Sequence, residues 1–136
     1  ASALFMQTLA QAKLNDDDPG ATLFVAQKAI MALKEAGERK DLAAACVLAG
    51  DLYIANGEGD EASRVANEAT GIYQELGDDN GIAACHLIQS AVFLLLDEAD
   101  NAMDEANKAL GLYSSTGNIS GKAGAKHKLS QCHRLN

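Results

Sequence analysis

Apolar and small residues recur along this chain at steps of three and four, which is the spacing of one face of an α-helix. Between positions 62 and 73, for example, alanine, isoleucine and tyrosine alternate with polar residues at these steps. Patterns of this kind predict seven helices, each roughly 20 to 24 Å long at 1.5 Å per residue. The expected ranges are 2–14, 21–36, 41–55, 61–76, 81–95, 100–116 and 121–134.

The same residue types return after 40 positions. Because several positions keep one register, the chain contains an internal repeat, and each period holds two helical patterns. Short connections force neighbouring helices to run antiparallel. We therefore expect an all-α fold in which helix hairpins stack into a right-handed α-solenoid. The positions that keep the step are Gly37, Gly77 and Gly117; Ala26, Ala66 and Ala106; Ala29, Ala69 and Ala109; Ala43, Ala83 and Ala123.

Glycines and acidic residues mark the ends of the expected helices. The glycine after each second helix suits a left-handed C-terminal cap, in which only glycine avoids a Cβ clash. Acidic residues such as Asp60, Glu61 and Asp100 stand near helix starts, where they complement the positive end of the helix dipole. We therefore interpret these acids as helix-start residues and not as metal ligands.

Each period resembles the tetratricopeptide repeat, in the 40-residue form of kinesin light chains. The family pattern is a small pair, an aromatic residue and a glycine turn in the first helix, then spaced alanines in the second. Lys13 replaces the aromatic residue of the first repeat, and Met6, Cys46, His86 and Lys126 stand at the tryptophan-like position. The matching residues are Leu9, Ala10, Ala26 and Ala29; Ala49, Gly50, Tyr53, Gly57, Ala62, Ala66 and Ala69; and Ser90, Phe93, Ala102, Ala106 and Ala109.

This resemblance implies a single domain over residues 1–136. It would contain three repeats, at about 1–40, 41–80 and 81–120, followed by a capping helix at 121–136 with polar residues toward water. Arrays similar to this family bind proteins on a concave surface lined by the first helix of each pair. No lysine, arginine and asparagine clamp for a C-terminal carboxylate is visible. The implied partner-binding groove carries Gln7, Gln11, Leu14, Val47, Asp51, Ile54, Leu87, Ala91, Leu94, His127, Gln131 and Arg134.

The segment 83–96 is apolar nearly all round, with only His86, Gln89 and Ser90 as a polar stripe. A helix of this kind is buried on nearly all sides. Either it is the core of its own stack, or one side of it meets a partner. His86 is expected to be a packed core histidine and not a ligand.

Composition and charge narrow the possible functions. Apolar residues make up 48% of the chain, which argues against disorder. The net charge is −8, but residues 106–136 hold five basic and no acidic residues, while residues 1–105 hold 19 acidic and six basic ones. Nucleic acid binding needs a basic face, so we expect no nucleic acid partner. The uneven charge would steer and orient protein partners.

Cysteine usage and hydropathy bear on the compartment. Cys46, Cys85 and Cys132 each lie in an apolar helical stretch and are expected to be buried, reduced thiols in an intracellular reducing compartment, cytoplasmic or organellar. No CxxC or HxxxH pair exists, so we expect no metal site and no cofactor. No apolar run reaches the roughly 18 residues of a membrane span.

These observations predict a non-catalytic scaffold that binds a protein segment through an apolar concave groove. No Ser-His-Asp order, paired catalytic carboxylates or nucleotide loop can be assembled from so regular an array, so we expect no enzyme and no catalytic residues. The alternative is a structural or assembly subunit that is permanently bound in a larger complex, for which an organelle is one of the two expected compartments. In that case other chains would cover the groove or the 83–96 helix.

Overall fold

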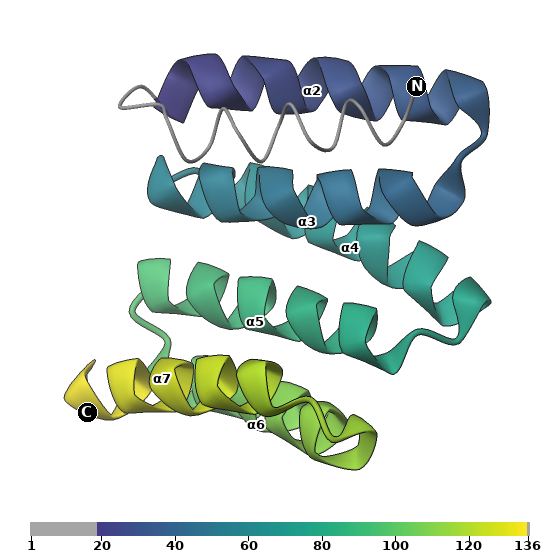
Figure 1. Ribbon diagram of the computed structural model, residues 1–136. Coiled ribbons are helices and arrows are strands. Elements are labelled where there is room, and N and C mark those ends of the chain that lie inside the picture. The colour runs from purple at the N-terminus through teal and green to yellow at the C-terminus, as the bar shows by residue number, and fades with distance from the viewer. Residues whose placement is uncertain (1–18, 136) are drawn as a thin grey trace.

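The computed structural model describes residues 19–135, and these residues form six helices joined by short turns (Figure 1). No strand occurs in this range. The expected helix at 2–14 lies outside the described residues. The helices are α2 (Pro19–Ala36), α3 (Arg39–Ala55), α4 (Gly59–Leu76), α5 (Asp79–Leu95), α6 (Ala99–Thr116) and α7 (Ile119–Leu135).

The helices stack as hairpins in sequence order. Each helix packs against the next one along the chain, and α3 also contacts α5, as α5 contacts α7. Figure 1 shows α3, α5 and α7 one below the other, with α4 and α6 behind them. The described part of the chain is therefore all-helical, and its packing is that of a helical repeat solenoid.

The two sides of this stack are unequally spaced. Cα atoms of α3 and α5, and of α5 and α7, come within 8 Å of each other, but no Cα atoms of α2 and α4, or of α4 and α6, do so. The stack is thus closer on the side of α3, α5 and α7. We call the side formed by these three helices the inner face, because an array that is shorter on one side curves toward it.

Alanines that keep the 40-residue step form the seam between helices. All of those in α2, α4 and α6 are completely buried. A methyl side chain lets two helices approach closely, and the core is then completed by a few larger residues such as Leu33, Val65 and Ile88. The alanines with no exposed surface include Ala26, Ala29, Ala66, Ala69, Ala106 and Ala109.

The turns follow the expectation for glycine. Gly77 and Gly117 cap α4 and α6 with φ angles of 68° and 72°, in the left-handed region. In the turn after α4, the Asp78 N–H donates to the carbonyl of Tyr73 at 2.9 Å, which closes the helix end. Asp97 is the one non-glycine residue with positive φ in the described range, at 59°.

Candidate functional site

The predicted groove residues of α3 lie on the inner face with different degrees of exposure. Val47 and Ile54 are half-buried and pack against the larger hydrophobic core. Asp51, between them in sequence, is exposed. This helix therefore offers the edges of two apolar side chains and one carboxylate.

The groove residues of α5 are less accessible than an open apolar groove requires. Ala91 is only 7% exposed, and Leu87 and Leu94 are half-buried. Leu87 packs against a small buried cluster that contains Tyr113 and Ala125, which ties α5 to α6 and α7. A Cβ atom at Gly124 of α7 would lie 3.9 Å from Leu87 Cδ1. Much of the apolar surface of α5 is thus used inside the chain itself.

The groove residues of α7 make the last part of the inner face polar. His127 is exposed and Gln131 is half-buried. The side chain of Arg134 lies outside what the structure describes, as do Gln7, Gln11 and Leu14 near the N-terminus. The described residues among those predicted for the groove therefore lie on α3, α5 and α7.

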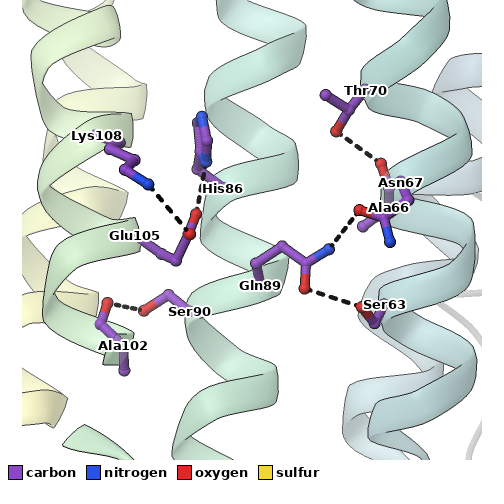
Figure 2. A network of polar contacts seen from close by, with 10 residues as sticks. All are labelled: Ser63, Ala66, Asn67, Thr70, His86, Gln89, Ser90, Ala102, Glu105 and Lys108. Carbon is purple, nitrogen blue, oxygen red and sulfur yellow. Dashed lines mark hydrogen bonds and ion pairs between the residues drawn. The ribbon is translucent and has the colours of Figure 1, made fainter. Parts of the chain in front are cut away.

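The polar residues of α5 join this helix to its neighbours on both sides (Figure 2). The Gln89 amide donates to Asn67 Oδ1 of α4 at 3.1 Å, and the Ser63 hydroxyl donates to Gln89 Oε1 at 3.1 Å. Ser90 is completely buried, and its hydroxyl donates to the Ala102 carbonyl of α6 at 2.7 Å. The polar residues 86, 89 and 90 thus do not form one stripe, because they point to two different helices.

His86 is half-buried between α5 and α6. Its Nδ1 lies 2.6 Å from Glu105 Oε2, and Lys108 Nζ lies 3.5 Å from the other oxygen of that carboxylate. Glu105 is itself mostly covered, with 18% of its side chain exposed. The contact is a structural link between two helices, and the histidine that was expected to be packed in the core is half-buried beside a carboxylate.

Burial raises the pKa of the Cys46 and Cys85 thiols and so keeps both protonated at neutral pH. All three cysteines are free and buried. Burial, with a smaller contribution from Glu68, raises the pKa of Cys46 from 9.0 to about 12. Burial likewise raises the pKa of Tyr73 to about 12. A thiol held protonated in this way is a poor nucleophile and a poor metal ligand.

The end of α5 is different from its middle. Leu95 is 45% exposed and Leu96 is 61% exposed. Both line a cavity of about 480 Å³ whose other walls are Val92 and residues 57–61 at the start of α4. We call this cavity the loop-edge pocket. Sequence reasoning placed Leu95 and Leu96 within the central helix and missed the pocket, because the turn before α4 that completes it is distant in sequence.

A second cavity, of about 410 Å³, lies on the opposite side between α2, α3 and α4. Two ion pairs cross it, Lys34 Nζ to Glu68 Oε1 at 2.9 Å and Arg39 Nη2 to Glu75 Oε2 at 2.6 Å. Its charged groups are therefore already paired within the chain.

Three further findings concern sequence similarity, metal ligands and membrane-spanning helices. The sequence matches no family model and no curated protein. Within residues 19–135, no three His, Cys, Asp or Glu side chains are grouped as ligands of a metal ion. None of the described helices is both long enough and apolar enough to cross a bilayer.

Proposed function

We propose that this chain is a non-catalytic protein-interaction scaffold of the tetratricopeptide-like kind, which holds a segment of another protein against its inner face. The observation that carries the proposal is the side-by-side packing of α3, α5 and α7 along the closer side of the stack. Three parallel rows of side chains then offer one continuous surface for an extended or helical segment. The three cysteines are free and buried, so these thiols support a structural role in the core.

The surface would bind through apolar residues of α3 and α5. Val47 and Ile54 of α3 and Leu94 of α5 supply apolar contacts, and Asp51 of α3 and His127 of α7 supply polar ones. Burying the exposed part of a leucine or isoleucine contributes about 1 kcal/mol, so three such residues together support a moderate affinity. Because the helices are preformed, the partner loses most of the conformational freedom on binding and the scaffold loses little.

The alternative proposal is a permanently bound subunit of a larger assembly. The exposed leucines at the end of α5 favour it, since other chains would cover them. The burial of most of α5 inside the chain reduces the apolar surface that needs such a cover. Sedimentation of the purified chain separates the two proposals: a soluble monomer at high concentration disfavours the permanent subunit, and aggregation or obligate co-purification disfavours the free scaffold.

A photo-cross-linker placed at single sites tests the binding face. A cross-linking amino acid at Leu94 of the inner face should capture one protein in stoichiometric amount from an extract of the source cells. The matched control is the same amino acid at Met31, which is 66% exposed on α2, a helix that is not part of the inner face. Equal capture at both sites, or none at Leu94, would show that the inner face does not hold the partner.

A charge substitution provides the second arm of this test. With the cross-linking amino acid moved to Ile54 of α3, Leu94→Glu should lower the captured amount at least tenfold, because it places a carboxylate among the apolar residues of the contact. Leu87→Glu should act in the same direction but also weaken the fold, since Leu87 packs on the buried cluster around Tyr113. Circular dichroism and urea unfolding of each variant distinguish lost binding from lost structure.

A further inference from the structure

The loop-edge pocket combines apolar walls with a negative rim. Val92, Leu95 and Leu96 of the α5 end form the apolar part, and both leucines are exposed to solvent at its mouth. Gly59 forms the floor: a Cβ atom there would lie 3.6 Å from Leu95 Cδ1 and 3.6 Å from Val92 Cγ1. Because Gly59 has no side chain, the space above the two apolar residues stays open.

The charge at the mouth is acidic. Glu58, Asp60 and Glu61 line the pocket, and Asp97 and Glu98 directly follow Leu96 in the next turn. Arg64 pairs with Glu61 at 2.9 Å and neutralises that one carboxylate. Neither Glu58 nor Asp60 forms an ion pair with another described residue. An open apolar pocket with unpaired carboxylates around it attracts a ligand that is apolar at its tip and positively charged beside it.

From this complementarity we infer that the loop-edge pocket is a second docking site, which takes a large apolar side chain of a partner protein segment flanked by lysine or arginine. The inference rests on the proposed binding function and adds the chemistry of the partner to it. The apolar side chain buries the exposed parts of Leu95 and Leu96, while the basic residues lie against Glu58 and Asp60. The pocket lies at the edge where first helices turn into second helices, so a segment on the inner face can continue into it.

The charge pattern selects among possible occupants. An acidic or uncharged apolar segment would leave the carboxylates at the rim without partners and in a less polar environment, which is costly. A second copy of this chain would have to present its basic residues from 106–136, which include Lys122, Lys126 and Lys128 on α7. Of the apolar residues near them, Ile119 is 83% exposed at the start of the helix. Self-association through α7 is therefore the competing occupant that the experiment must separate.

Two synthetic amphipathic peptides of roughly 18 residues serve as probes, each with leucines along one helical face. The first carries lysine at its polar positions and the second carries glutamate. Fluorescence anisotropy with the full chain at about 0.1 M salt should show binding of the lysine peptide and at least tenfold weaker binding of the glutamate peptide. Equal binding of both peptides, or no binding of either, overturns the inference.

Variants then locate the binding. Leu95→Ser with Leu96→Ser should weaken the lysine peptide by about tenfold or more, because the apolar contact is lost while the charge is unchanged. The matched control is Leu76→Ser, since Leu76 is 49% exposed at the end of α4 and also precedes two aspartates but lines no described pocket. Glu58→Gln with Asp60→Asn should reduce both the affinity and its dependence on salt. An unchanged affinity in the leucine variant, or an equal loss in the control, overturns the inference.

A pocket-filling variant tests the space itself. Gly59→Leu places a side chain over Val92 and Leu95 and should block the lysine peptide while every charge and both leucines remain. Sedimentation of the unliganded chain decides the competing occupant: self-association that disappears in the leucine variant assigns the pocket to a second copy and overturns the partner assignment. The cross-linker at Leu94 is then tested in the Leu95→Ser, Leu96→Ser variant. If capture persists there, the proposed scaffold function stands even where the loop-edge pocket binds nothing.

Discussion

At the residue scale, the close packing of the helices depends on two glycines that face tyrosine rings. Tyr73 of α4 lies directly against Gly81 of α5, and 40 residues later Tyr113 lies against Gly121 of α7 in the same way. In both places a Cβ atom on the glycine would overlap the tyrosine ring. The first repeat has neither partner, since Leu33 and Asp41 stand at the corresponding positions. The tyrosine and the glycine therefore occur together: the repeat that lacks the tyrosine also lacks the glycine.

Two glycine substitutions in neighbouring helices are expected to have opposite effects. Gly81→Ala should lower the free energy of unfolding by about 1 to 3 kcal/mol, because the added methyl group displaces the ring of Tyr73. Gly71→Ala is the control. Gly71 lies in the exposed middle of α4 with no atom within 4 Å of a Cβ, so alanine there should raise stability by about 1 kcal/mol. Urea unfolding of both variants measures the difference, and a neutral Gly81→Ala would contradict the close ring contact.

The buried thiol of Cys46 makes stability depend on alkaline pH. Folding raises its pKa from 9.0 to about 12, so the folded state favours the protonated thiol. The stabilisation is fully present below pH 9 and is lost as the pH rises through this range toward 12. The free energy of unfolding should therefore fall between pH 9 and pH 10.5, with Tyr73 adding to the decline above pH 10.

Urea unfolding at pH 8, 9.5 and 10.5 measures this decline. Cys46→Ala is less stable at every pH because it leaves a cavity, but its decline over the same range should be smaller than in the parent chain. Equal slopes for the two proteins would mean that the Cys46 thiol ionises alike in the folded and unfolded states.

At the element scale, helix ends were predicted better than helix starts. The expected ends at 36, 55, 76, 95 and 116 are the observed ones, because a glycine or an acidic turn interrupts the apolar pattern there. Observed starts at 39, 59 and 79 precede the expected ones by two residues. The first turn contains polar residues such as Arg39, Asp60 and Asp79, which carry no apolar period. The hydrophobic pattern therefore becomes visible only in the second turn.

Pairing between helices was harder to predict than their existence. The sequence places Ser90 beside two other polar residues, but the side chain donates into α6 from a fully buried position. Its partner is a backbone carbonyl, which every residue has, so the amino-acid sequence does not reveal this hydrogen bond. The repeat register predicts which helix carries each inner-face residue. It does not predict how exposed Leu87 is, because that depends on the side chains of α6 and α7 that pack against it.

Removal of α7 is expected to weaken the helices that it covers. This helix contacts α5 and α6, and its Ala125 belongs to the buried cluster with Ala109 and Tyr113. A chain that ends at residue 118 should lose about 3 kcal/mol or more of stability, since the cluster becomes exposed. Urea unfolding measures the loss, and Ile119→Ser is the control because Ile119 is 83% exposed and contributes little. An unchanged unfolding midpoint in the shortened chain would contradict the role of α7 as a cover.

At the scale of the whole molecule, each helix depends only on nearby helices. Contacts join helices that are adjacent in sequence or separated by one, and none joins α2 or α3 to α6 or α7 in the described range. Stability is then a sum of units and of the interfaces between neighbours. The charge is not distributed evenly along the stack, because all 19 acidic residues lie in 1–105, whereas residues 106–136 hold five basic residues and no acidic one. The two ends of the chain therefore differ in the sign of their charge.

The alternation of inner and outer helices also limits how such a chain can change length during evolution. Duplication of a full period leaves every later helix on its original side, because each period supplies one helix to each side. Insertion of a single helix would instead exchange the two sides for everything downstream, and the alanine seams would then meet solvent. Growth in whole periods keeps one helix of every period on the inner face, while growth by half a period does not.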